Sequence, residues 1–388
     1  MSQPVNSIIS TTSGEQTKAT NLDKIATQCK EFLSSPLEPE ASDLSYTNAV
    51  SKDENLKFIC TAAPVTLKEI DNSFTNHDIK CEFLLIRYIT DDDKHRKKLM
   101  TFKNPTINKL NRFTNVIPYE SNSVPVSKEV KGRDANNYIN ASFVTGPMGI
   151  KFIAAQNPME NTLNSFWLMI INHKVSLVIL FSYTFEESND KYIQYWPKET
   201  NTPITITGLN NVKYTIKLTS QMDVIEKYVV VRYLEVYLDN QVIHTITHYH
   251  VNCWEEHSIP LQQIGFQVLE DLIWKVEEHK HSPVLIHCSD GIGRTGTFIS
   301  LFNIIKCLHA QKEANEESPM LNIFNVVRKL REERYGMVTD FVQYKYIYDF
   351  CKIWMNRFYE VETSEEKEKK KKLEEEKKRK EEENQKKD

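Results

Sequence analysis

The sequence predicts a mixed domain of the α/β or α+β class, because strand-like and helix-like patterns follow one another from about residue 58 to residue 359. β-branched and aromatic runs, such as KVSLVILFS at 174–182, are typical of strands. Stretches with an apolar residue at every third or fourth position, such as 261–278, are typical of amphipathic helices. No Gly/Ser-rich linker or internal repeat interrupts the region, so we expect a single domain over residues 56–360.

The elements of this domain can be expected in chain order. Helices are expected at 76–89, at 261–278, from about 295, at 320–334 and at 341–359. Strands are expected at 174–182, at 284–286 and as an antiparallel group within 212–238. The strand at 284–286 leads through a glycine-rich turn directly into the helix from about 295, which predicts a strand–turn–helix unit.

The two ends of the chain differ in composition from this domain. Residues 1–55 are rich in Ser, Thr, Asn and Glu and are expected to be mostly disordered, with a short helix at 22–33 as an alternative. Residues 361–388 alternate Glu and Lys blocks and lack the apolar seam of a coiled coil, so we expect disorder or a solvated single helix. Their basic clusters leave nuclear targeting as an alternative use.

Composition argues against several classes of protein. The net charge of −4 is unusual for a general nucleic-acid binder. The seven cysteines are scattered without CxxC spacing, which argues against a zinc cage or a disulfide framework and fits a reducing compartment. We find no apolar run long enough to span a membrane and no signal-peptide pattern. We therefore expect a cytoplasmic protein.

The segment VLIHCSDGIGRTGTF at 284–298 carries the strongest chemical signal. Five residues separate Cys288 from Arg294, and Gly291 and Gly293 let the backbone turn its N–H groups inward. A ring of N–H groups at a helix N-terminus binds a dianion, and an arginine clamps phosphate oxygens in a bidentate manner. The residues expected to surround the phosphate are Ser289, Asp290, Gly291, Ile292 and Gly293.

Cys288 is the expected nucleophile. Positive surroundings lower the pKa of a thiol and produce the thiolate, which is the attacking form. His287 and Thr295 are expected to hold the loop and the leaving thiolate by hydrogen bonds. A lone cysteine after a core strand would more simply be a buried, inert thiol. Here the His–Cys–five residues–Arg spacing, the glycines and the following Thr-Gly occur together, which favours catalysis.

This loop resembles the signature loop of the tyrosine-specific, cysteine-dependent protein tyrosine phosphatases, and the resemblance covers about residues 75–355. Four more segments are similar to motifs of that family: NRF at 111–113, NYINAS at 137–142, FIAAQ at 152–156 and QYWP at 194–197. The resemblance implies a twisted mixed sheet flanked by helices. It also implies phosphotyrosine-containing proteins as partners, hydrolysis through a cysteinyl phosphate, and no metal or other cofactor.

The resemblance implies roles for residues outside the loop. Asn111 and Phe113 would form the substrate pocket, with the Phe113 ring stacked on the substrate ring; ordinary packing is the alternative for this aromatic residue. Lys191 would lie beside the substrate. Glu186 would pair with Arg294.

Three positions depart from the family pattern. Glu256 stands where the family has the aspartate that serves as general acid, and it is one methylene longer; a solvated loop charge is the alternative. Asp290 replaces an alanine inside the phosphate loop, where its charge repels phosphate and raises the pKa of Cys288. Thr339 replaces the glutamine that orients the hydrolytic water, whereas a second glutamine is retained as Gln343.

The departures leave three functions open. The first is a protein tyrosine phosphatase of reduced rate. The second is a catalytically impaired pseudophosphatase that binds phosphotyrosine proteins, and the third is a scaffold with a vestigial pocket. The intact pair of Cys288 and Arg294 favours the first.

Overall fold

The computed structural model describes residues 12–34, 65–66, 76–91, 93–100, 105–130, 137–183, 192–225, 227–316 and 319–358. Glu186, Lys191 and the charged tail at 361–388, for which the sequence made predictions, lie outside these residues. Within them, no helix is both long enough and apolar enough to cross a bilayer.

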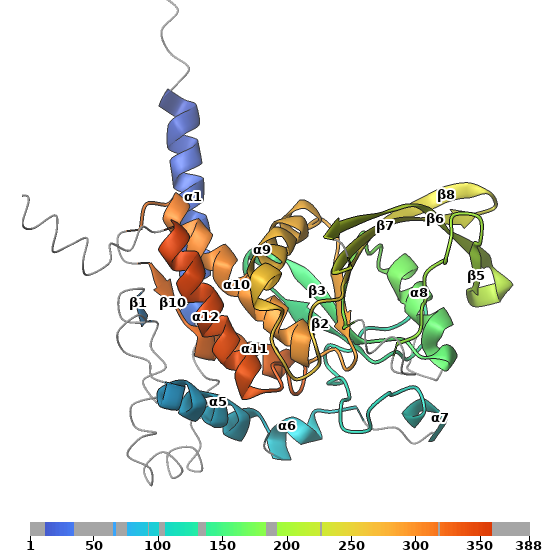
Figure 1. Cartoon of the computed structure of the whole chain (residues 1–388), viewed down its shortest axis with the longest axis horizontal. Coiled ribbons are helices and arrows are strands. Elements are labelled where there is room, and N and C mark those ends of the chain that lie inside the picture. Colours follow the sequence, from blue (N-terminus) through green and yellow to red (C-terminus); the bar gives the residue numbers. More distant parts are fainter. Residues whose placement is uncertain are drawn as a thin grey trace, which may run out of the picture.

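An eight-stranded mixed sheet forms the centre of the molecule, with helices packed against it (Figure 1). The strand order is β2-β3-β9-β4-β8-β7-β6-β5. The four strands β3, β9, β4 and β8 run parallel to one another, and the remaining pairs are antiparallel. The strands are β2 Ala141–Thr145, β3 Lys151–Gln156, β4 Leu177–Phe181, β5 Ile204–Thr207, β6 Lys213–Ile225, β7 Val229–Leu238, β8 Gln241–Val251 and β9 Val284–Cys288. The expected twisted mixed sheet flanked by helices is confirmed.

The α-helices are α1 Thr12–Ser34, α5 Asn76–Thr90, α6 Asp93–Lys97, α7 Pro105–Asn108, α8 Leu163–Asn172, α9 Gln262–Glu278, α10 Gly293–Glu313, α11 Ile323–Glu333 and α12 Phe341–Phe358. Helices α5, α9, α10, α11 and α12 follow helical patterns of the sequence, whereas α6, α7 and α8 were not expected. The helix expected at 320–334 begins later because Met320 and Leu321 form the short strand β10, which pairs with β1 at Val65–Thr66. Asn322 then caps α11 by accepting a hydrogen bond from the Asn325 amide.

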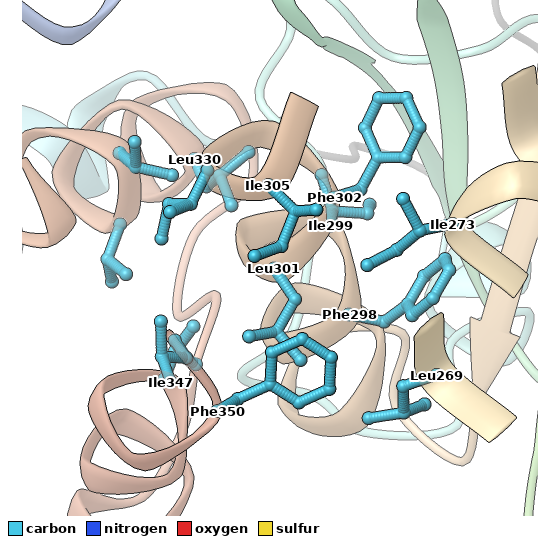
Figure 2. Close-up of a cluster of buried hydrophobic side chains, with 14 of the residues drawn as sticks. Leu269, Ile273, Phe298, Ile299, Leu301, Phe302, Ile305, Leu330, Ile347 and Phe350 are labelled. Carbon is cyan, nitrogen blue, oxygen red and sulfur yellow. The ribbon is translucent and has the colours of Figure 1, made fainter. Parts of the chain in front are cut away.

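Side chains of the central strands alternate between two apolar clusters, one on each face of the sheet. In β9, Val284 and Ile286 face α9 to α12, whereas Leu285 faces the cluster that contains α8. Parallel strands buried on both faces have continuous apolar sequences, as β4 does. Figure 2 shows the helical side: α10 lies centrally, and side chains of α9, α11 and α12 point toward it. The labelled residues there include Leu269, Ile273, Phe298, Leu330, Ile347 and Phe350.

The strand–turn–helix unit expected around Cys288 is present. The central strand β9 ends at Cys288, and α10 begins at Gly293. The connecting turn therefore lies at the carboxyl ends of the parallel strands, the edge where open α/β sheets bind ligands. Because β9 and α10 are both buried in the core, the turn between them is rigidly supported.

Helix α1 packs against this core from the N-terminal segment that was expected to be mostly disordered. It includes the 22–33 stretch for which a helix was the alternative, and it is longer at both ends. Its last turns bury Cys29 and Leu33 in the main apolar cluster. The Asn325 side chain of α11 donates to the Leu33 carbonyl at 3.1 Å. Residues 1–11 and 35–55 lie outside the described part, so the prediction for them stays a prediction.

Candidate active site

The turn from Cys288 to Arg294, hereafter the phosphate loop, needs glycine at position 291. Gly291 has φ +70°, a left-handed conformation that favours glycine. A Cβ at this position would also lie 2.2 Å from the Ala155 carbonyl oxygen of β3. At the other end of the loop, a Cβ on Gly293 would lie 2.8 Å from Thr339 Oγ1. The loop is therefore packed tightly on both sides.

The carboxylate of Asp290 occupies the ring of inward N–H groups. Its Oδ1 accepts hydrogen bonds from the amides of Ile292 at 2.9 Å and Gly293 at 3.2 Å. The Cys288 thiol donates to the same oxygen at 3.2 Å. An internal anion thus satisfies donors that were expected to face a phosphate.

Cys288 is fully buried, and its environment favours the neutral thiol. Burial and the Asp290 charge raise its pKa to about 11, against the opposing effects of Arg294 and a hydrogen bond from Thr295. The Thr295 hydroxyl donates to Cys288 Sγ at 3.2 Å. The expectation of a lowered pKa is therefore wrong for this arrangement, because burial and Asp290 outweigh the positive groups. The expected contact of Thr295 with the sulfur is present.

Arg294 and Glu256 meet beside the phosphate loop. The guanidinium of Arg294 is 1% exposed and donates to the Trp254 carbonyl at 2.7 Å and to the Tyr192 hydroxyl at 2.9 Å. Glu256 Oε1 lies 3.9 Å from Arg294 Nη2, and the Glu256 side chain is 18% exposed. The Glu256 side chain therefore lies beside Arg294 and is largely shielded from solvent.

Arg334 fixes the outer side of the phosphate loop. It is 1% exposed. Its guanidinium donates to the carbonyls of Gly291 at 2.9 Å and Asp290 at 3.1 Å, and to Asn140 Oδ1 at 2.9 Å and Ser142 Oγ at 3.1 Å. With these carbonyls held outward, the neighbouring N–H groups point inward. Sequence reasoning missed Arg334, because nothing in the surrounding REERYG indicates that its arginines are buried, although both Arg331 and Arg334 are.

His287 lies behind the phosphate loop and not within it. Its Nε2 is hydrogen-bonded to the Tyr195 hydroxyl at 2.7 Å, and that hydroxyl also bonds His248 Nε2 at 2.8 Å. Burial lowers the pKa of His287 to about 3, so its ring is neutral. Through Tyr195, the ring ties the end of β9 to the apolar cluster that contains α8. It therefore supports the neighbouring Cys288 through the backbone.

The two expected pocket residues of the NRF segment, Asn111 and Phe113, are both shielded from solvent at least in part. Asn111 is a support residue: its Oδ1 accepts from the Tyr138 hydroxyl at 2.5 Å and from Asn140 Nδ2 at 2.8 Å. Phe113 is half-buried. Arg112 lies between Asn111 and Phe113 in the sequence, and its backbone amide donates to Gln156 Oε1 at 2.9 Å. The NRF segment is thus tied to the end of β3, next to the phosphate loop.

Of the other expected residues, Ser289 is buried with no hydrogen-bond partner for its hydroxyl among the described residues. Thr339 Oγ1 is likewise buried and unpaired there. Gln343 is buried and accepts a hydrogen bond from the Thr339 amide at 3.2 Å. Side-chain atoms of both residues also lie against Gly293. Within the described ranges, no group of three or more His, Cys, Asp or Glu side chains is placed to hold a metal ion.

Sequence comparison matches residues 107–352 to the protein-tyrosine phosphatase family. Human receptor-type tyrosine-protein phosphatase epsilon is 32% identical over 270 residues, which is 68% of this chain and 36% of the relative. Human phosphatidylinositol phosphatase PTPRQ is 30% identical over 241 residues, or 61% of this chain and 10% of the relative. The chain thus spans about a third or less of the length of these relatives.

Solved structures share the fold. The catalytic domain of human protein tyrosine phosphatase non-receptor type 18 has a TM-score of 0.60 at 23% identity, covering 71% of this chain and 95% of that one. The same phosphatase in complex with HER2 phosphopeptides has a TM-score of 0.63 at 22% identity, covering 74% of this chain and 97% of that one.

Proposed function

The chain belongs to the protein-tyrosine phosphatase family, and we propose that it hydrolyses phosphotyrosine in proteins at a reduced rate. One observation carries the proposal: Cys288 and Arg294 stand at the two ends of the phosphate loop, and Glu256 from a separate segment lies beside Arg294. Nucleophile, clamp and acid are the three groups that phosphate-ester hydrolysis through a covalent intermediate requires.

In the first step, a phosphate replaces the Asp290 carboxylate at the loop amides. The thiolate of Cys288 attacks phosphorus, the bond from phosphorus to the tyrosine oxygen breaks, and Glu256 gives its proton to that oxygen. The loop N–H groups and Arg294 stabilise the charge on the remaining phosphate oxygens. The half-buried Phe113 ring serves as the wall for the tyrosine ring.

In the second step, water attacks the cysteinyl phosphate. Glu256 takes a proton from the water, the sulfur leaves as thiolate, and the hydrogen bond from Thr295 stabilises it. Thr339 and Gln343 lie against Gly293, where they can orient the water. We also propose that Lys191 lies beside the substrate and that Glu186 pairs with Arg294, as the family resemblance implies.

The reduced rate follows from Asp290. Each unit by which the pKa of Cys288 exceeds the working pH lowers the thiolate population about tenfold. The carboxylate must also leave two amides before the phosphate can bind them. Both costs fall on the first step.

The Asp290 carboxylate on the loop amides favours a second candidate, a pseudophosphatase that binds phosphotyrosine proteins without turnover. A phosphate loop occupied by its own Asp290 carboxylate, together with a neutral Cys288 thiol, would slow or prevent the attack on phosphorus in such a protein. The two candidates differ in whether phosphate is released.

Phosphate release from a phosphotyrosine peptide by the full chain decides between them. We expect slow, time-dependent release that Cys288→Ser abolishes and that Cys81→Ser, at a half-buried cysteine of α5, leaves in place. Peptide binding that depends on Arg294, without turnover above that of Cys288→Ser, would establish the second candidate. Faster release from a phosphatidylinositol phosphate, the substrate class in the name of one relative, would overturn the protein substrate.

A further inference from the structure

A side-chain bridge joins two loops above the phosphate loop. His257 Nδ1 lies 2.8 Å from Asp340 Oδ2. His257 directly follows Glu256 in the acid loop at 254–260, and Asp340 directly follows Thr339 in the turn before α12. The bridge thus connects the segment that carries the proposed acid to the segment that carries the proposed water-orienting threonine.

Both connected segments are held on the phosphate loop. The Val338 amide donates to the Ile292 carbonyl at 3.0 Å, which fixes the turn before α12. The Trp254 carbonyl accepts from Arg294, which fixes the start of the acid loop. Because both segments are attached to the phosphate loop, the bridge between them can set the position of Glu256 relative to Cys288.

The backbone of His257 shows that the acid loop is constrained at this point. His257 has φ 58°, in the left-handed region that residues other than glycine seldom adopt. Such a conformation costs free energy and persists where surrounding interactions hold it. The His257 side chain itself contributes to this hold through its hydrogen bond to Asp340.

We propose that His257 is a positioning residue for Glu256, and that its protonated ring, bonded to Asp340, holds the acid loop over the phosphate loop. This inference rests on the proposed function. The pair is partly solvated, with side chains 61% and 32% exposed, so solvent weakens it and its effect is one of position.

The bridge depends on pH in a defined direction. Three carboxylates act on the charge of the His257 ring: Asp340 from the turn before α12, Glu256 from the acid loop and Asp290 from the phosphate loop. The hydrogen bond to Asp340 raises the pKa of His257, burial opposes it, and the other two charges add to the increase. A raised pKa means that the bridge is complete at low pH and is lost as pH rises through that pKa.

Kinetics with two aryl phosphates separate positioning from general damage. A poor leaving group, as in phenyl phosphate, needs the acid; a good one, as in 4-nitrophenyl phosphate, needs it much less. We expect His257→Ala to lower kcat about tenfold on phenyl phosphate, part of the 10²–10⁴ that a general acid supplies. On 4-nitrophenyl phosphate we expect little change. An equal loss on both substrates would overturn the proposal.

His257→Gln is the conservative variant. Its amide can donate to Asp340 without a charge, so we expect it to recover most of the rate on phenyl phosphate. In the wild type, we expect the rate on phenyl phosphate to fall as pH rises and the His257 imidazole loses its proton. We expect His257→Gln to lack this fall. The matched control is His309→Gln, because His309 forms a similar partly exposed pair with Glu313 on α10, Nδ1 to Oε2 3.6 Å. This control should keep its rate on both substrates.

A titration of the His257 ring by NMR needs no turnover. We expect Asp340→Asn to lower the pKa of His257 toward its ordinary value. An unchanged pKa would overturn the bridge. A chain without turnover would instead overturn the proposed function and, with it, the positioning role, while the titration would still decide whether the bridge exists.

Discussion

At the scale of single residues, Asp290 decides how the candidate site is occupied. A carboxylate on two loop amides resembles one edge of a bound phosphate. The sequence predicted that its charge raises the pKa of Cys288 against Arg294, but not that burial and this charge together outweigh the positive groups. It did not predict that the carboxylate would fold back onto amides two and three residues ahead, because that depends on the rotamer available inside a crowded turn.

Asp290→Ala should activate the enzyme. The substitution frees the loop amides and removes a charge that raises the pKa of Cys288, so more thiolate forms at neutral pH. We expect kcat/KM for a phosphotyrosine peptide to rise about tenfold, the effect of one pKa unit. Alkylation of the thiol by iodoacetamide, followed against pH, should shift to lower pH in parallel.

Asp290→Asn is the matched control for charge. The amide keeps an oxygen in the same place but carries no negative charge, so we expect an intermediate rate. If neither variant changes the rate or the alkylation profile, Asp290 does not control the site.

At the scale of elements, the sequence predicted the units whose signals are local. The apolar run of β9, the glycines and the pattern of α10 specify a strand, a turn and a helix within a few residues. The partners of buried polar groups could not be predicted in this way. Arg334 reaches Gly291 from 43 positions away, and Asn111 accepts a hydrogen bond from the Tyr138 hydroxyl, 27 positions along the chain. Such pairings depend on tertiary packing, which local periodicity does not contain.

Gly291→Ala should lower the unfolding free energy by more than the left-handed backbone conformation of residue 291 alone explains. The left-handed backbone costs an alanine about 1–2 kcal/mol. The added Cβ would also meet the Ala155 carbonyl at 2.2 Å, so β3 or the loop must move. We expect a larger loss of unfolding free energy than that range in urea titrations, together with loss of phosphate release.

Gly149 provides the comparison for Gly291. It has φ +77°, and an added Cβ would meet nothing within 4 Å. Gly149→Ala should therefore lose only about 1–2 kcal/mol and keep its activity. Equal losses for the two variants would mean that the contact between the loop and β3 is not tight.

At the scale of the whole molecule, helices outside the matched region 107–352 complete the core. Helix α5 packs on α11 and α12, and α1 packs on α10. Figure 1 shows α1 beside α10, with its N-terminal part projecting beyond the domain. Helix α10 begins in the phosphate loop, and α1 packs near its other end, where Cys29 meets Cys307. Helix α1 therefore supports the candidate site only indirectly, through α10. The composition of residues 1–55 gave no signal of this packing, since only a few apolar residues of α1 make it.

The packing of α1 can be measured at one of these residues. Leu33 is 1% exposed, and a buried leucine replaced by alanine costs about 2–5 kcal/mol. We therefore expect Leu33→Ala to lower the unfolding free energy by that amount in urea titrations. Leu84→Ala, at a leucine of α5 that is 51% exposed, should change it by no more than about 0.5 kcal/mol. If the two variants are equally stable, α1 does not pack on α10 in solution, and the folded domain begins after α1.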